Sequence, residues 1–181
     1  MKYLYPLIII SILAIASCQS KNSSTIQEDS MFQIFIFSET KELRQMHHQD
    51  LLNIALSDAS FIINENNLLS YDWTNQQINI DKTTVSDSDQ KRLLSDAYFV
   101  VVFNQQPIIA GKRILEFSPT SYAYPVLSIL ANSYQPNQPI QYALRNNSLG
   151  VNQAPYPFLN PDPTIAEAVK NHLRQLGKLV E

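Results

Sequence analysis

Two apolar segments constrain the fold most, because both predict strands in the interior of a β-sheet. Residues 98–103 read YFVVVF and give the strongest strand signal in the chain. Residues 31–37 read MFQIFIF and are mostly apolar on both faces of an extended segment, which is typical of a buried strand. A domain with two such segments is expected to be built around a sheet.

A polar turn follows the stronger of these strands. The turn is Asn104-Gln105-Gln106, and the chain then returns over residues 107–117 as a partner strand. Gly111 interrupts the partner strand, and there it predicts a bulge or a close backbone contact.

The remaining segments mix short strands with helices. Strand patterns occupy residues 61–63, 68–73, 77–80, 126–131 and 140–144. Helical patterns occupy residues 39–56, 86–97 and 161–177, and the first of these helices can be two turns shorter. Because strands and helices alternate and hairpins occur among the strands, we expect an α+β fold. It would have a mainly antiparallel or mixed sheet with about three helices packed against it.

The helix over residues 161–177 has the clearest boundaries. Asp162 can cap it, Pro163 suits the first turn, and Gly177 suits the stop. An alternative start is Thr164, with Glu167 completing a capping box. Its core stripe is expected to consist of apolar residues spaced three or four apart: Ile165, Val169, Leu173 and Leu176.

The chain begins with a pattern typical of an export signal. Lys2 supplies a positive charge, and residues 4–15 are then nearly all apolar. This run is about a dozen residues long, whereas a helix that spans a bilayer needs roughly 20. The small residues Ala16 and Ser17 follow it, as cleavage by a signal peptidase requires.

The end of this segment resembles the lipobox of bacterial lipoproteins: Ile15-Ala16-Ser17-Cys18. The resemblance implies cleavage before Cys18 and a diacylglycerol on its sulfur, which would hold the protein to membrane lipid. It covers only the first 18 residues. A plain secretory signal with a chance cysteine, or an uncleaved anchor, are the alternatives.

The lipobox divides the chain into three parts. Residues 1–17 would be the signal peptide, and residues 18–30 the lipidated cysteine with a polar tether too poor in apolar residues to fold. Residues 31–181 would form one globular domain. Position 19 is Gln rather than the Asp of inner-membrane retention signals, so the resemblance favours the outer membrane, facing the periplasm.

Charge and cysteine content exclude several classes of protein. The net charge is −3, and loss of Lys2 with the signal makes it −4, so the chain lacks the basic surface that binding to nucleic acid requires. Cys18 is the only cysteine. The domain therefore has no thiol for a disulfide, a zinc cluster or a nucleophile.

The sequence contains no catalytic motif of a known kind. GxSxG and HExxH are absent, and with glycine only at positions 111, 150 and 177 no glycine-rich phosphate loop can form. The weak catalytic candidates are His47 with Asp50, expected on one face of the first helix, and His172 on the last helix. Each histidine can equally be a structural residue at the edge of the core. We expect no metal and no cofactor.

Proline and tyrosine are concentrated between residues 118 and 162, without a clean strand or helix period. Tyrosine on stiff loops makes good contact surfaces, and Tyr122, Tyr124 and Tyr156 are the candidate binding residues. The alternative is that these rings fold back onto the sheet and fix the loops in place.

The sequence therefore favours a non-enzymatic binding domain at a membrane surface, with an envelope protein or glycan as partner. A small hydrolase or lyase that uses a histidine and a carboxylate is the alternative, and an accessory subunit of an envelope complex is a third.

Overall fold

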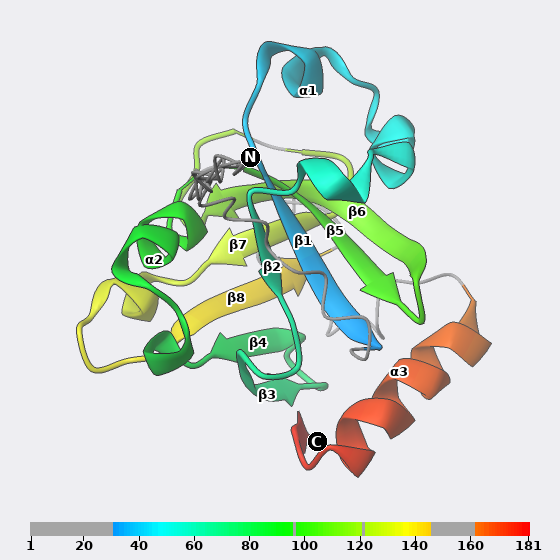
Figure 1. Cartoon of the computed structure of the whole chain (residues 1–181), viewed down its shortest axis with the longest axis vertical. Coiled ribbons are helices and arrows are strands. Elements are labelled where there is room, and N and C mark those ends of the chain that lie inside the picture. The colour runs from blue at the N-terminus through cyan, green and yellow to red at the C-terminus, as the bar shows by residue number, and fades with distance from the viewer. Residues whose placement is uncertain (1–30, 96, 121, 146–161) are drawn as a thin grey trace, which may run out of the picture.

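A curled, mixed β-sheet forms the centre of the domain (Figure 1). The computed structural model describes residues 31–95, 97–120, 122–145 and 162–181. In this part of the chain nine strands form one sheet in the order β2-β1-β5-β6-β7-β8-β4-β3-β9, which curls into a half-barrel. Neighbouring strands are antiparallel except β6 with β7 and β3 with β9, which are parallel. The predicted α+β class with a mixed sheet is confirmed.

The strands lie close to where the sequence predicts them. Their bounds are β1 Phe32–Ser38, β2 Phe61–Ile63, β3 Leu68–Asp72, β4 Gln77–Ile80, β5 Ala97–Phe103, β6 Gln106–Leu115, β7 Val126–Ile129, β8 Ile140–Arg145 and β9 Leu179–Val180. Only β9 has no counterpart among the strands that the sequence predicts; it is a two-residue strand that pairs with β3 after the last helix.

Short helices connect the strands. The α-helices are α1 Lys41–Gln45, α2 Asp87–Leu93 and α3 Pro163–Gln175. The 3₁₀ helices are η1 His48–Asn53, η2 Leu56–Asp58, η3 Lys82–Thr84 and η4 Ala131–Tyr134. Asp162 caps α3 by accepting from the backbone N–H of Thr164 at 2.8 Å, and Gly177 takes a positive φ of 67° just beyond its end. The start at Asp162 is therefore confirmed, and the alternative capping box at Thr164 is wrong.

The single helix predicted over residues 39–56 is wrong. The chain leaves helical geometry at Met46 and His47, where ψ is near 140°, and continues as η1 and η2. Histidine, aspartate and asparagine from position 47 onward have low helix propensity. The apolar residues of this segment instead pack individually against the sheet: Leu43, Met46, Leu51, Ile54 and Leu56.

The larger hydrophobic core lies inside the curl of the sheet, and we call it the inner core. Alternate residues of β1 and β5, such as Ile34 and Phe99, point into it, as do Tyr71 and Tyr142 from the far side of the curl. Helices α2 and α3 close it with fully buried side chains: Leu93, Val169 and Leu173. Leu176, expected in the same stripe, is exposed.

A second, smaller cluster covers the opposite face of β1, β5 and β6, and we call it the outer core. It contains the intervening residues of those strands: Phe35, Phe37, Tyr98, Val100, Val102 and Ala110. The segment from α1 to η2 covers it, and Leu51 of η1 is its buried contribution. The strands β1 and β5 are apolar on both faces because both faces are covered.

Gly111 lies where β6 meets the chain entering β7. A Cβ atom at this position would stand 1.9 Å from the carbonyl oxygen of Pro125. The Pro125 oxygen also accepts from the backbone N–H of Lys112 at 3.2 Å. The predicted close backbone contact at Gly111 is confirmed, and it allows the parallel pairing of β6 with β7.

Candidate functional site

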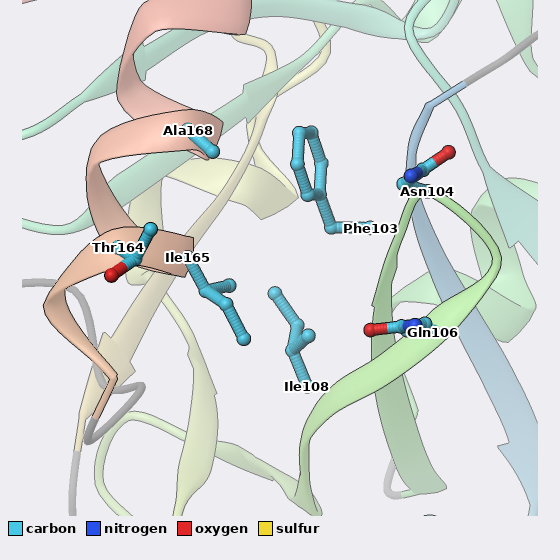
Figure 2. A pocket seen from close by; sticks show the side chains of 7 residues that line it. All are labelled: Phe103, Asn104, Gln106, Ile108, Thr164, Ile165 and Ala168. Carbon is cyan, nitrogen blue, oxygen red and sulfur yellow. The ribbon is translucent and has the colours of Figure 1, made fainter.

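A cleft of about 190 Å³ opens between the β5–β6 hairpin and the first turns of α3 (Figure 2). The side chains of Phe103, Ile108 and Ile165 converge on it in the figure, and Ala168 lines it from α3. Its polar lining residues are uncharged: Asn104, Gln106 and Thr164. An apolar floor with a few polar groups at the edge is the usual composition of a small-ligand site.

The hairpin side of the cleft is held by a tight turn. Asn104 and Gln105 have positive φ values of 48° and 64°, the geometry of a two-residue hairpin loop with both central residues left-handed. The backbone N–H of Asn104 donates to the carbonyl of Met31 at 2.8 Å. The start of the domain therefore lies at the rim of the cleft.

The helix side of the cleft is the amino-terminal end of α3. Asp162 accepts from the N–H of Thr164 through its carboxylate, and its carbonyl accepts from Ala166 at 3.2 Å. A carboxylate therefore already occupies this helix end. The side chain of Ile165 is partly buried and packs against the inner core.

A histidine and a carboxylate meet close to the cleft. His172 Nε2 lies 2.6 Å from Glu65 Oε1, and their side chains are 14% and 16% exposed. The same oxygen of Glu65 accepts from the backbone N–H of Phe32 at 2.8 Å. The His172 ring also meets the edge of Phe103, a lining residue, at 5.8 Å between centroids. The group joins α3, the β2–β3 turn and the start of β1.

The predicted pair of His47 and Asp50 does not form as a side-chain pair on a helix. Both residues are exposed, and the Asp50 backbone N–H donates to the carbonyl of His47 at 2.9 Å. The break at Met46 and His47 removes the common helical face on which the prediction depended. His47 and Asp50 belong to the start of η1, just after α1, whereas His172 belongs to α3, and α1 and α3 lie at opposite ends of Figure 1.

Tyr122 and Tyr124 are half-buried beside the outer core. Their rings lie 5.3 Å apart, and Tyr124 stacks on His48 with 5.3 Å between centroids and 4° between planes. Burial raises the pKa of Tyr124, with Tyr98 and Tyr122 adding to the effect. These contacts fit rings that fix a loop, and a binding role for the two residues stays a prediction. Tyr156 and Cys18 lie outside the described residues.

Lys112 connects these rings to the outer core. Its Nζ lies 2.9 Å from Glu39 Oε1 and over the rings of Tyr98 and Tyr122, at 5.4 and 5.5 Å from their centroids. Burial opposes the charged form of Lys112, but the hydrogen bond to Glu39 and the two tyrosines outweigh it and raise its pKa. The charges of Lys112 and Glu39 balance each other, as expected of a cluster with a structural role.

Other buried polar groups bind the backbone of α2. The Arg113 guanidinium, fully buried on β6, donates to the carbonyls of Arg92 and Ser95. The Tyr142 hydroxyl donates to the carbonyl of Leu93 at 2.6 Å, and burial raises the pKa of Tyr142 to about 12. The two side chains satisfy carbonyls at the end of α2 and just beyond it, which is a structural role.

The described residues contain no group of three or more His, Cys, Asp or Glu side chains that could hold a metal ion. None of their helices is long and apolar enough to cross a membrane.

The sequence matches no protein-family model, no curated protein and no solved structure. The site must therefore be interpreted from its own geometry.

Sequence reasoning missed the cleft and Glu65. The turn at residues 104–106 and the helix that carries Ile165 were each predicted, but no local pattern places one beside the other. Glu65 is 107 positions from His172, and it lies in a polar turn that gives no sign of a tertiary partner. The sequence predicts Ile165 in the core stripe, and the structure has it packed against the inner core and lining the cleft.

Proposed function

We propose that the protein is a lipid-anchored, non-enzymatic binding domain of the bacterial envelope, with the cleft between the β5–β6 hairpin and α3 as its ligand site. The observation that carries the proposal is the position of the cleft at the end of the domain where the tether joins. Met31, the first described residue, accepts from the backbone of Asn104 on the cleft rim.

The tether limits how far this end can move from the anchor. Twelve residues, 19–30, separate Cys18 from Met31. From Cys18 to Met31 a fully extended chain spans about 47 Å at most. The cleft would therefore work within that distance of the lipid surface. The lipobox resemblance and Gln19 favour the outer membrane facing the periplasm, with an envelope protein, lipid or glycan as partner.

The anchor is tested by replacing Cys18 with Ser in the full-length protein. We expect the variant to appear as a soluble or unprocessed precursor, because no thiol remains to carry lipid. Cell fractionation with a carbonate wash shows whether the protein is in the washed membrane or in the soluble fraction. Normal processing and retention in the washed membrane would contradict the lipobox interpretation.

The binding site is tested by photo-cross-linking in intact cells. A photoreactive residue replaces Gln106 on the cleft rim, and in a matched control it replaces Lys91, an exposed residue of α2. We expect an adduct from position 106 that position 91 does not give. Equal labelling at both positions would overturn the proposal. An adduct with subunits of a membrane complex would favour the accessory-subunit alternative.

One observation favours an enzyme as the second candidate: the contact between His172 and Glu65. A carboxylate that orients an imidazole is part of many acid–base sites. In this structure the same carboxylate oxygen also accepts from the backbone N–H of Phe32 at the start of β1, so Glu65 also has a structural role. A hydrolase would lose turnover of a chromogenic ester in His172→Gln without loss of stability. Loss of stability alone would support the structural role.

A further inference from the structure

We propose that the occupant of the cleft is a single hydrocarbon chain, presented by a lipid molecule of the membrane that holds the anchor. The inference rests on the proposed function and names the ligand class of that same site. Four observations carry it: the lining, the state of the surrounding backbone, the size of the cleft and its position.

The lining fits a hydrocarbon. The converging side chains of Phe103, Ile108 and Ile165 offer only carbon atoms to an occupant. None of the seven lining residues is charged, so a charged group placed there would lose its water without gaining a partner of opposite sign. Asn104, Gln106 and Thr164 at the edge can hydrogen-bond to the ester or hydroxyl groups near the head of a lipid.

The surrounding backbone disfavours the other ligand classes. An extended peptide binds by adding to a free strand edge, but β5 and β6 are interior strands, with β1 and β7 on their outer sides. The Asn104 N–H already donates to Met31, and the Thr164 N–H to Asp162. An anion at the end of α3 would therefore meet the carboxylate of Asp162. A hydrocarbon chain needs none of these groups.

The size of the cleft limits how much of a lipid enters. Its volume of about 190 Å³ holds roughly six groups of the size of a water molecule, at about 30 Å³ each. This suits part of one chain and excludes a whole lipid. The remainder of the molecule would stay outside the protein.

The position of the cleft identifies the source of the chain. The rim contacts Met31, itself an exposed apolar residue, and the anchor lies 13 positions earlier at Cys18. The chains on Cys18 hold the protein in the bilayer, and withdrawing one would loosen that attachment. A separate lipid can supply a chain at no such cost, so we assign the site to a neighbouring lipid molecule.

The test uses the full lipidated protein in vesicles of phosphatidylethanolamine and phosphatidylglycerol. The vesicles contain a trace of phosphatidylcholine whose acyl chain carries a diazirine, and labelled sites are mapped by mass spectrometry after irradiation. Ala168→Phe fills the cleft from an exposed helix position, and Glu167→Phe adds the same ring at the neighbouring exposed position. Thermal unfolding verifies that both variants fold.

We expect labels on the cleft residues of the wild type. In Ala168→Phe the labelling should fall about tenfold, the loss expected when about two methylene groups leave their contacts. Glu167→Phe should label as the wild type does. Absence of label from the cleft, or equal labelling of the two variants, would overturn the assignment to a hydrocarbon chain.

This outcome is separable from failure of the proposed function. If the cleft is not labelled by the acyl probe but position 106 still cross-links to another envelope molecule, the binding function stands and the hydrocarbon assignment fails. If neither experiment gives an adduct, both proposals fail.

Discussion

The two faces of the β1–β5–β6 region are covered in different ways. Helices α2 and α3 close the inner core with the fully buried Leu93, Val169 and Leu173. The outer core is covered by a five-residue α-helix and two 3₁₀ helices, in which Leu51 is the buried apolar residue. At its margin Tyr124 stacks on His48, and the Tyr122 ring meets Tyr124 at an angle of 58°.

The inner core is therefore closely packed, whereas the outer core has a thinner cover. A helix presents apolar side chains at regular spacing, and each one excludes water from several neighbours. The outer cover buries few side chains and relies on half-exposed rings and on the Lys112–Glu39 pair. We therefore expect the outer core to open more readily than the inner core.

The largest effect is expected at Gly111, because a side chain there would collide with the backbone of Pro125. In Gly111→Ala the Cβ would lie 1.9 Å from the Pro125 oxygen and 3.0 Å from the Phe99 ring. The backbone must shift, and we expect a loss of about 4 kcal/mol or more in the free energy of unfolding. Urea titration measures it. Gly177→Ala is the control, with no atom within 4 Å; its positive φ costs about 1 kcal/mol. Equal losses would contradict the close contact.

Truncation of one leucine on each side tests the comparison itself. Leu173→Ala removes a fully buried side chain of the inner core, and Leu51→Ala removes a side chain that is 2% exposed in the outer core. We expect losses of about 4 kcal/mol for Leu173 and about 2 kcal/mol for Leu51, since the thin outer cover can collapse into the gap. Urea titration of both variants gives the order, and the reverse order would contradict the account.

The fold was largely predictable because its signals are local. The strands β2 and β4 and the cap at Asp162 follow from patterns of a few residues, and the structure has them at the predicted positions. The segment from α1 to η2 was not predictable in the same way. Its apolar residues have nearly helical spacing, but the twisted outer face of the sheet decides which of them are buried.

The site was less predictable than the fold. The cleft needs the β5–β6 hairpin and α3 side by side, and the Glu65–His172 contact joins a turn to a helix 107 positions away. Such contacts depend on tertiary packing, which a single sequence does not encode in any local period. The prediction that the binding residues lie on the loops between residues 118 and 162 stays a prediction, and the half-buried Tyr122 and Tyr124 are engaged with His48 and Lys112.

The tyrosine stack tests how much the rings contribute to the outer cover. Tyr124→Ala removes the ring that stacks on His48 and contacts Tyr122. We expect a loss of about 1–2 kcal/mol, less than for a fully buried aromatic side chain. Differential scanning calorimetry measures the change, with Tyr124→Phe as the control that keeps the ring. If the variant is as stable as the wild type, the ring does not stabilise the loop, and Tyr124 is again a candidate binding residue.

The smallest effects are expected at the histidines. His172→Gln shortens the group that contacts Glu65, and we expect a loss of about 1 kcal/mol because Glu65 keeps its bond to Phe32. His47→Gln changes an exposed residue and should alter stability by less than about 0.5 kcal/mol. Chemical denaturation distinguishes them. A larger loss at His47 would show that the α1 end is more tightly packed than the structure indicates.

Hydrogen–deuterium exchange of the anchored protein tests most directly whether the cleft works at the membrane. The wild type in vesicles is compared with Cys18→Ser in solution, residue segment by residue segment. We predict slower exchange in the anchored form at residues 103–108 and 164–168, which line the cleft, and unchanged exchange at the α1 end. Equal exchange at the cleft in both forms, or protection confined to the α1 end, would contradict the account.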